Sequence, residues 1–327
     1  MPHSKPVRSM LEALRIAAGL TQLDLARATG TAQSEISKLE SRGLDPDDPR
    51  LDGLAKALNR ARAALLAPSI RPRLLHSFGR QVPLRSIRSH EASVMIVHAQ
   101  VASLLSGVDG LPQADDKAYG LSDLSEVDPE NLATLLRQNW GLFREPFIDG
   151  VALAETHGII CVRGDLQHLG VAALGSWPDG HRPLMIIDPE TSPSAQRRAI
   201  AHEIGHRLLQ REASGAAERA AQAFAEEFVL PASPIRAAMY VDPDGIPKQA
   251  DYWGVPVIEF AKRLHDLRLL PRRRLERYVT DFADQPGSEA ANSRPQTVRT
   301  AVKTRQSNGE ALDRIAESAF VSPNRIS

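Results

Sequence analysis

The segment RRAIAHEIGHRLL, residues 197–209, is the feature that most constrains what this chain can fold into. Apolar residues recur along its whole length, so a helix formed here belongs in a protein core. His202, Glu203 and His206 then lie on a buried helix, where polar side chains are costly unless they have partners. Because residues four apart share one helix face, both imidazoles can point at a single ion. The segment therefore predicts a metal centre on a core helix.

A second helix is expected to supply the third metal ligand. A catalytic zinc ion takes three protein ligands and keeps one position open for water, so two histidines are not enough. Residues 218–228 are rich in alanine and phenylalanine and can pack closely on the first helix. Glu218 lies near the start of this segment, twelve residues after His206, whereas Glu226 and Glu227 lie two turns or more further along. We therefore expect Zn²⁺ to be bound by His202, His206 and Glu218.

Glu203, between the two histidines, is the predicted catalytic base. A bound zinc ion would acidify a water molecule and polarise a carbonyl, and Glu203 would carry the proton to the leaving amine. The predicted enzyme is a zinc metalloendopeptidase. The strand expected at Leu184–Ile187 is placed to hold an extended substrate by edge pairing. Tyr240, Tyr252 and His265 are C-terminal candidates for an oxyanion stabiliser, and the sequence favours none of them.

The first 66 residues have the parts of a helix-turn-helix. Ala26 is small enough for two helices to cross closely, and Gly30 can make the turn between them. Ile36 and Leu39 fall at helical spacing and would bury the second helix. Helices are expected at residues 7–18, 21–28, 33–40 and 51–65.

The charge of the whole chain does not identify its partners. Forty basic residues balance forty acidic ones, so any binding of nucleic acid depends on local charge. Residues 1–66 hold ten basic and eight acidic residues, a small surplus. Residues 60–90 hold seven arginines and no acid, with prolines that interrupt regular structure. This basic linker either contacts DNA phosphates or only stays soluble and extended.

The chain has one cysteine, Cys161, which cannot form an internal disulfide and fits a reducing compartment. No stretch approaches the 18 apolar residues of a membrane helix, and the N-terminal region lacks the apolar core of a signal peptide. We therefore expect a cytoplasmic protein without a membrane span.

Residues 131–270 resemble the ImmA/IrrE family of bacterial metallopeptidases. The resemblance rests on the AHEIGH helix, on an E-x-x-A-x-x-FA helix that ends before Pro231, and on a closing amphipathic helix at 257–269. It implies a zinc peptidase that cuts a DNA-binding repressor and so releases transcription. The family often has Asn four residues after the ligand Glu, where this chain has Gln222, which can still hydrogen-bond a ligand.

Residues 7–65 resemble the Cro/repressor (XRE) class of helix-turn-helix domains. In that class Gln22 would cap the first helix of the motif against a phosphate, and Gln33, Ser34 and Lys38 would face the major groove. The resemblance implies operator DNA as a partner. Such proteins often bind as homodimers, although no segment here specifies an interface.

Together these features predict an α+β fold in four parts. The parts are a helix-turn-helix DNA-binding domain at 1–66, a basic linker and helical connector at 67–128, a mainly helical metallopeptidase domain with a small sheet at 129–281, and a largely disordered tail at 282–327. We find no internal repeat in the sequence.

The leading hypothesis is a transcriptional regulator that binds an operator and cleaves a repressor protein. In one alternative it is a DNA-binding repressor or antitoxin-like regulator whose peptidase-like domain senses a signal or partner without proteolysis. The presence of Glu203 argues against that alternative, because a sensor needs no base beside the metal. In a second alternative the N-terminal helices recognise the repressor rather than DNA.

Overall fold

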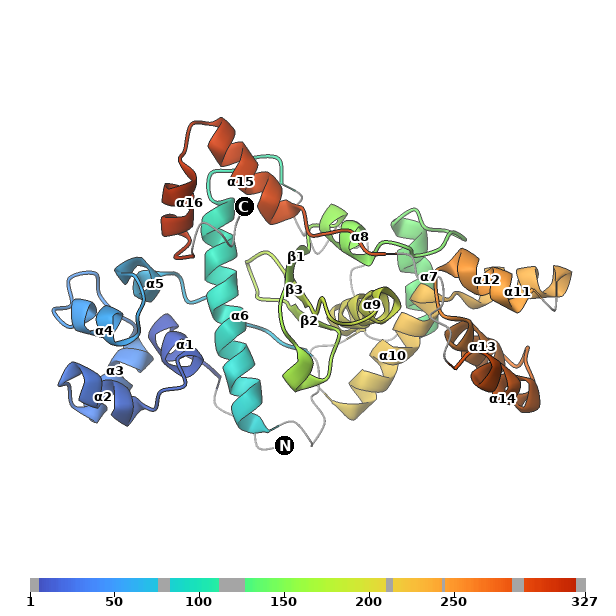
Figure 1. The fold of residues 1–327 in the computed structure, drawn as a ribbon, viewed down its shortest axis with the longest axis horizontal. Coiled ribbons are helices and arrows are strands. Elements are labelled where there is room, and N and C mark those ends of the chain that lie inside the picture. The colour runs from blue at the N-terminus through green and yellow to red at the C-terminus, as the bar shows by residue number, and fades with distance from the viewer. Residues whose placement is uncertain are drawn as a thin grey trace.

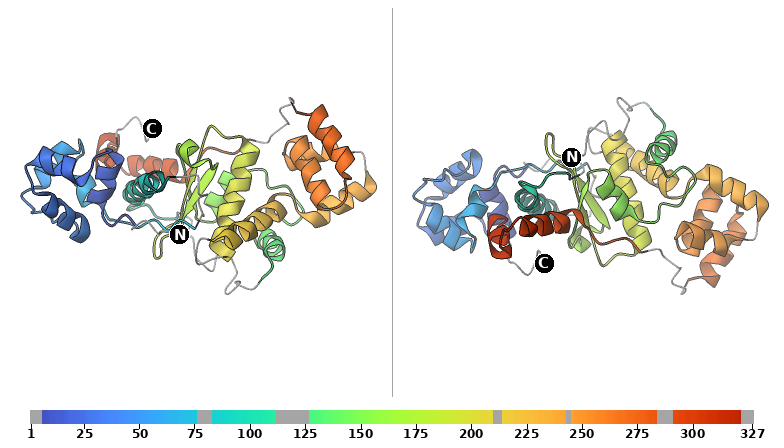
Figure 2. Two further views of the ribbon diagram at one scale, coloured as in Figure 1. Left: turned by 90° about the horizontal axis from the view of Figure 1, so that it is seen from below. Right: turned by 90° about the horizontal axis from the view of Figure 1, so that it is seen from above.

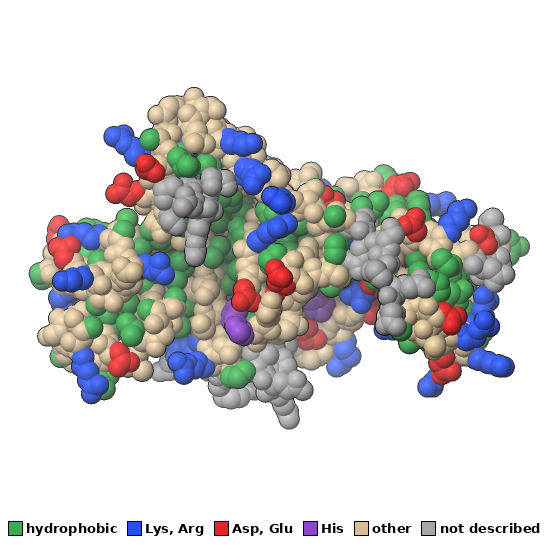
Figure 3. All heavy atoms as spheres, in the orientation of Figure 1, with side chains coloured by type: hydrophobic (Ala, Val, Ile, Leu, Met, Phe, Trp, Pro, Cys, Tyr) green, Lys and Arg blue, Asp and Glu red, His purple; other side chains and the backbone are tan. Residues whose placement is uncertain are grey.

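The computed structural model describes residues 6–75, 83–111, 127–209, 214–242, 245–283 and 291–321. Helices surround a three-stranded sheet within these residues, which confirms the predicted α+β class (Figure 1). None of the helices in the described ranges is long and apolar enough to cross a membrane. Basic and acidic side chains are mixed over the face in view, and basic side chains follow the helix α15 (Thr297–Ser307) near the C-terminus (Figure 3).

The N-terminal helices pack around one apolar core, as the sequence predicts. They are α1 (Met10–Ala17), α2 (Gln22–Thr29), α3 (Gln33–Arg42), α4 (Leu51–Ala57) and α5 (Arg62–Leu66). The single helix predicted at 51–65 is divided in two. Asn59 has a φ of 49° and so ends α4, because asparagine tolerates the left-handed conformation better than most residues.

Helix α6 (Leu84–Leu105) stands between the N-terminal helices and the sheet and belongs to both cores (Figure 1). Its face toward the N-terminal helices carries Ala92, Met95 and Ala99, and its face toward the sheet carries Val94, Val101 and Leu105. The sequence predicted helix only from residue 91 and a linker before it. The helix begins earlier, directly after Pro83, because proline is well suited to the position before the first turn.

The sheet has β3 (Leu184–Ile187) at its centre, with β1 (Ile160–Arg163) parallel to it and β2 (Ala173–Ser176) antiparallel. Alternate side chains of each strand point to opposite faces, and both faces are buried. One face packs on α8 (Gly150–Thr156) and α9 (Pro193–Leu209), and the other packs on α6 and α15.

The remaining helices extend the molecule away from the N-terminal helices. Helices α7 (Pro129–Asn139) and α10 (Gly215–Val229) pack beside α9. A lobe at the far end contains α11 (Ala232–Val241), α12 (Ile246–Trp253), α13 (Val257–Asp266) and α14 (Arg272–Asp281) (Figure 2). Of these four, the sequence predicted only α13.

The described part of the tail that was predicted to be largely disordered contains two helices. Helices α15 (Thr297–Ser307) and α16 (Leu312–Ser318) return to pack on α6. Ile315 of α16 and Ala319, the residue that caps this helix, are buried together with Leu104 of α6. These few apolar side chains suffice to hold a polar segment because α6 offers them a preformed surface.

Residues 300–321 also repeat the backbone conformation of residues 10–31. Corresponding turns close with matching hydrogen bonds, from Leu20 N to Arg15 O and from Glu310 N to Arg305 O, both 3.1 Å. Two further turns match through Thr31 N to Ala26 O and Val321 N to Ala316 O, both 3.0 Å. Gly19 and Gly309 both have positive φ, and so do Gly30 and Phe320. This repeat cannot be recognised in the sequence, because Phe320 stands where the first segment has the turn glycine and few other residues are identical between the two segments.

Helices α9 and α10 approach most closely at Gly205. A Cβ atom added there would lie 2.9 Å from the Phe224 ring and 3.3 Å from the Ala221 backbone. We predict that Gly205→Ala lowers the free energy of unfolding, because overpacking costs about 1–3 kcal/mol and exceeds the roughly 1 kcal/mol gained in helix propensity. Urea denaturation measures the difference.

Gly53 in α4 provides the matched control, since a Cβ atom added there meets nothing within 4 Å. Gly53→Ala should raise the free energy of unfolding by about 0.5–1 kcal/mol. An increase for both variants would contradict the close packing at Gly205.

Candidate metal centre and nucleic-acid interface

Two histidines of α9 and one glutamate of α10 converge. His202 and His206 lie one turn apart, with their Nε2 atoms 3.0 Å from each other. Glu218, in the first turn of α10, places Oε2 3.2 Å from His202 Nε2 and Oε1 3.3 Å from His206 Nε2. His206 is fully buried, and Glu218 is about a quarter exposed at its side chain.

This arrangement fits a zinc ion. The three ligand atoms lie within 4.8 Å of one another. Zinc binds imidazole nitrogen and carboxylate oxygen at about 2.0–2.2 Å, so ligand atoms about 3.2 Å apart can share one ion. Two imidazoles and one carboxylate are also the ligand set of catalytic zinc sites that leave a fourth position open.

Glu203 lies beside this cluster and is 1% exposed. Its Oε2 atom accepts a hydrogen bond of 3.0 Å from the backbone N–H of Gly175 in β2. A Cβ atom at position 175 would lie 3.0 Å from Glu203 Oε2 and 2.7 Å from Trp177 Nε1, so only glycine allows this approach. A glycine inside a strand signals such close contacts, but the sequence pattern predicts a strand only at residues 170–174, so Gly175 is not recognised as a strand residue.

The prediction that Leu184–Ile187 offers a free edge to substrate is wrong. This segment is β3, which is paired on both sides, because β1 and β2 flank it. The outer edges of the sheet belong to β1 and β2, and at the edge of β2 Leu74 forms an antiparallel bridge with Ser176 while Trp177 N–H donates to Arg73 O at 3.0 Å. A segment preceding α6 therefore already lies along part of the edge of β2.

Helix α6 also contacts β2 through a buried polar pair. His98 Nε2 lies 2.9 Å from Ser176 Oγ, next to the glycine that holds Glu203. Burial lowers the pKa of His98 to about 4, with a smaller contribution from His181. The imidazole is therefore neutral near pH 7. This contact could not be predicted from the sequence, since a histidine inside an amphipathic helix has no specific signature.

The other predicted candidates lie elsewhere. Tyr240 is 89% exposed on α11, and the Tyr252 hydroxyl donates to Glu145 at 3.2 Å. His265 Nδ1 pairs with the carbonyl oxygen of Leu270 at 2.9 Å. None of the three belongs to the His202, His206 and Glu218 cluster, so no oxyanion stabiliser is identified among them.

Glu226 and Glu227, the other two candidate carboxylates of α10, bind partners outside the cluster of His202, His206 and Glu218. Glu226 accepts a hydrogen bond of 2.8 Å from Gln222, and Glu227 pairs with Arg263. Gln222, which the sequence suggested could hydrogen-bond a metal ligand, thus donates to Glu226.

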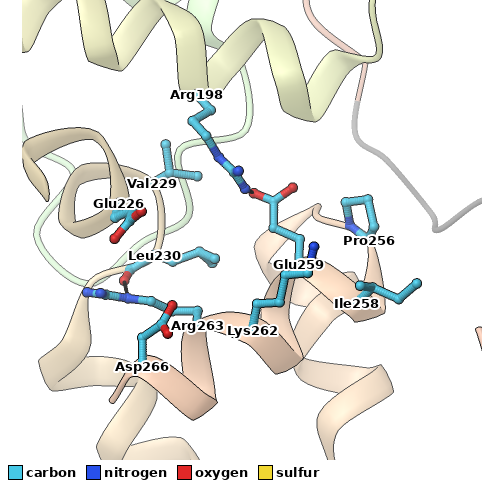
Figure 4. A pocket seen from close by; sticks show the side chains of 10 residues that line it. All are labelled: Arg198, Glu226, Val229, Leu230, Pro256, Ile258, Glu259, Lys262, Arg263 and Asp266. Atoms are coloured by element: carbon cyan, nitrogen blue, oxygen red, sulfur yellow. Dashed lines mark hydrogen bonds and ion pairs between the residues drawn. The ribbon is translucent and has the colours of Figure 1, made fainter. Parts of the chain in front are cut away.

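A charged pocket of about 290 Å³ lies between α9, the end of α10 and α13 (Figure 4). Arg198 reaches into it from α9, one turn before His202, and forms an ion pair with Glu259 of α13. Three basic and three acidic side chains line it, namely Arg198, Lys262, Arg263, Glu226, Glu259 and Asp266. The basic and acidic side chains of the pocket thus balance one another in charge and link the C-terminal lobe to α9 and α10.

The predicted DNA-contacting residues lie where α2 and α3 begin. Gln22 and Gln33 are the first residues of these helices, and Gln33 Nε2 donates to Gln22 Oε1 at 2.6 Å. Gln22 Nε2 in turn donates to the buried Glu40 at 2.7 Å, and Arg15 pairs with Glu40. The core of the domain thereby fixes the orientation of Gln33.

The other two predicted DNA contacts are exposed on α3. Ser34 follows Gln33 in the first turn. Lys38 Nζ lies 2.7 Å from Glu35 Oε1, a surface ion pair that costs little to break. Lys38 can therefore exchange this partner for a phosphate.

Comparison with known families agrees with these two units. Residues 154–265 match the family described as IrrE N-terminal-like domain, and residues 11–65 match the family described as helix-turn-helix. The chain joins a helix-turn-helix domain to an IrrE-like peptidase domain. Searches of curated proteins and of solved structures gave no match.

These matches confirm the fusion predicted from the sequence. The convergent histidines and Glu218 all lie inside the range of the peptidase family, which makes residues 154–265 a metallopeptidase-like domain. The helix-turn-helix match covers Gln22, Gln33 and the turn between them.

We predict that the purified chain binds about one zinc ion through the three convergent residues. Glu218→Gln should lower the zinc content strongly, because the amide is a neutral and weaker ligand, and His206→Ala should abolish binding. Added zinc should raise the melting temperature of the wild type and not of His206→Ala, because only a protein that binds the ion is stabilised by it. Metal analysis and thermal melts measure both effects.

His168 serves as a control, since it is exposed in the short 3-10 helix at Gln167–Leu169 and lies outside the cluster. His168→Ala should bind zinc like the wild type. Equal zinc content in His206→Ala and the wild type would rule out the proposed ligands.

Proposed function

We propose that this protein is a DNA-binding regulator whose second domain is a zinc-dependent endopeptidase that cleaves a repressor protein. The observation that carries the proposal is the convergence of His202, His206 and Glu218 beside a glutamate fixed by Gly175. A sensor domain would need the ligands but not a carboxylate oriented next to them.

The roles of the chain's own residues follow from this geometry. When bound, zinc supplies a Lewis acid and lowers the pKa of water. Glu203 accepts a proton from the attacking water at its carboxylate and donates it to the departing amine nitrogen. The hydrogen bond from Gly175 N–H to Oε2 holds the carboxylate of Glu203 in place for this proton transfer.

The fold supports a peptide as the substrate. The outer edge of β2 runs beside Glu203, and the bridge between Leu74 and Ser176 illustrates that this edge accepts an extended antiparallel segment. An extended peptide bound in this way would place its carbonyl groups next to α9. A repressor is the substrate favoured by the helix-turn-helix domain, since both proteins would then act at the same operator.

DNA binding rests on the arrangement of α2 and α3. The N-termini of these helices lie next to each other, since their first residues, Gln22 and Gln33, are hydrogen-bonded. Glutamine can bind adenine through two hydrogen bonds in the major groove. The hydrogen bond between Gln22 and Gln33 holds the side chain of Gln33 in place before DNA binds. This limits the side-chain entropy lost on binding.

We expect Glu203→Gln to abolish cleavage of a repressor encoded beside the gene of this protein while leaving the zinc content unchanged. The amide has the same shape but cannot accept the proton. Cleavage is followed by gel electrophoresis and mass spectrometry of the repressor, with zinc content measured on the same sample. The Glu226→Gln variant, altered outside the cluster, is the control and should cleave normally.

Two outcomes would contradict the proposal. An intact repressor under all conditions, with zinc bound to the wild type, would favour a sensor without proteolysis. Cleavage by Glu203→Gln at the wild-type rate would remove Glu203 from the mechanism.

For the DNA-binding domain, Gln33→Ala should weaken binding to an operator selected from a random library by about 1–3 kcal/mol. Binding to unrelated DNA should change much less, because the lost contact is to a base. Fluorescence anisotropy measures both affinities. An equal loss on all sequences would contradict base recognition by Gln33, and unchanged repressor cleavage would show that the variant is folded.

A further inference from the structure

An open groove of about 740 Å³ separates the helix-turn-helix domain from the beginning of α6. Its lining includes Gln22 and Gln33 on one side and Arg85 and Arg88 of α6 on the other, with Arg15 nearby. No acidic side chain occurs among its described lining residues. Arg15 is paired with Glu40 and Arg88 with Glu12, so the positive charge of the groove that has no acidic partner among the described residues comes from Arg85, next to the two helix N-termini that face DNA in this class of domain.

Several arginines of residues 60–90, the predicted basic linker, are already neutralised by acidic partners. Arg62 lies 2.8 Å from Asp52, and Arg73 lies 3.0 Å from Asp179 beside the sheet. Arg88 is held by Glu12 at 2.7 Å.

Arg85 differs from these three. It is exposed in the first turn of α6, and it forms no ion pair or hydrogen bond with the residues that the structure describes. Its charge is thus available to an external anion at the edge of the groove.

We propose that the DNA-binding surface extends from the helix-turn-helix domain onto the first turn of α6, where Arg85 contacts a phosphate of the DNA backbone. This inference rests on the proposed DNA-binding function. A guanidinium group binds phosphate through paired hydrogen bonds, and contacts to phosphate fix the position of a protein on DNA without reading its sequence.

The packing of α6 makes this contact rigid. Ala92 and Met95 of α6 are buried in the helix-turn-helix core. The ion pair between Arg88 and Glu12 fixes the same end of α6 to α1. The backbone of α6 that carries Arg85 is therefore fixed relative to the helix-turn-helix domain, so that little backbone entropy is lost when Arg85 and Gln33 bind one duplex.

The test compares Arg85→Ala with the wild type on a mixed-sequence duplex of roughly 30 base pairs over a range of salt concentrations. One lost phosphate contact should lower the slope of log affinity against log salt by about 0.9 and weaken binding roughly five- to tenfold near 0.1 M salt. The loss should be the same on a selected operator, in contrast to Gln33→Ala.

The control is Arg273→Ala, which removes the same charge from an exposed position on α14 in the distant lobe. It should leave affinity and slope at the wild-type values. Thermal melts of all three proteins should agree, because neither arginine is part of the core.

The outcomes separate this inference from the function on which it rests. A wild-type protein that binds no DNA at low salt would overturn both. A wild type that binds while Arg85→Ala keeps the full slope would overturn only the contact from α6. Equal reductions for Arg85→Ala and Arg273→Ala would also overturn it, since the effect would then come from net charge alone.

Discussion

The close packing of α9 on α10 is the constraint on which the rest of the structure depends. Gly205 lets the two helices approach until Phe224 and Ala221 contact the backbone of α9. Only at this separation can Glu218 reach both His202 and His206 from the neighbouring helix. The strand β2 then completes the site from the other side, because Gly175 holds the carboxylate of Glu203.

The convergence of the three proposed ligands could be predicted from sequence because its signal is local. His202 and His206 are four residues apart on an apolar helix, so their shared face can be recognised in the sequence. Glu218 lies in the first turn of the next helix, which is also rich in apolar residues. Gly175 could not be found in the same way, since its role depends on a strand packing against a helix distant in sequence. The same reason explains why β3 was wrongly given a free edge, as strand order is a property of the whole sheet.

The fold was predictable where amphipathic helices are separated by strong turn residues. It was not predictable where tertiary packing stabilises polar segments, as in α14 and in the repeat at 300–321. Helix α6 is the clearest example. Its early residues have the composition of a linker, yet one helix links two cores, contacting Glu12 through Arg88 and Ser176 through His98. The element that positions the DNA-binding domain therefore also supports the strand beside Glu203.

X-ray absorption at the zinc edge tests the central claim most directly. On the zinc-loaded protein, the account predicts nitrogen and oxygen neighbours at about 2.0–2.2 Å and the outer-shell scattering of two imidazole rings. The two rings correspond to His202 and His206, and the remaining protein ligand to Glu218. A sulfur neighbour at about 2.3 Å, or a spectrum without imidazole scattering, would contradict a metal centre built from α9 and α10.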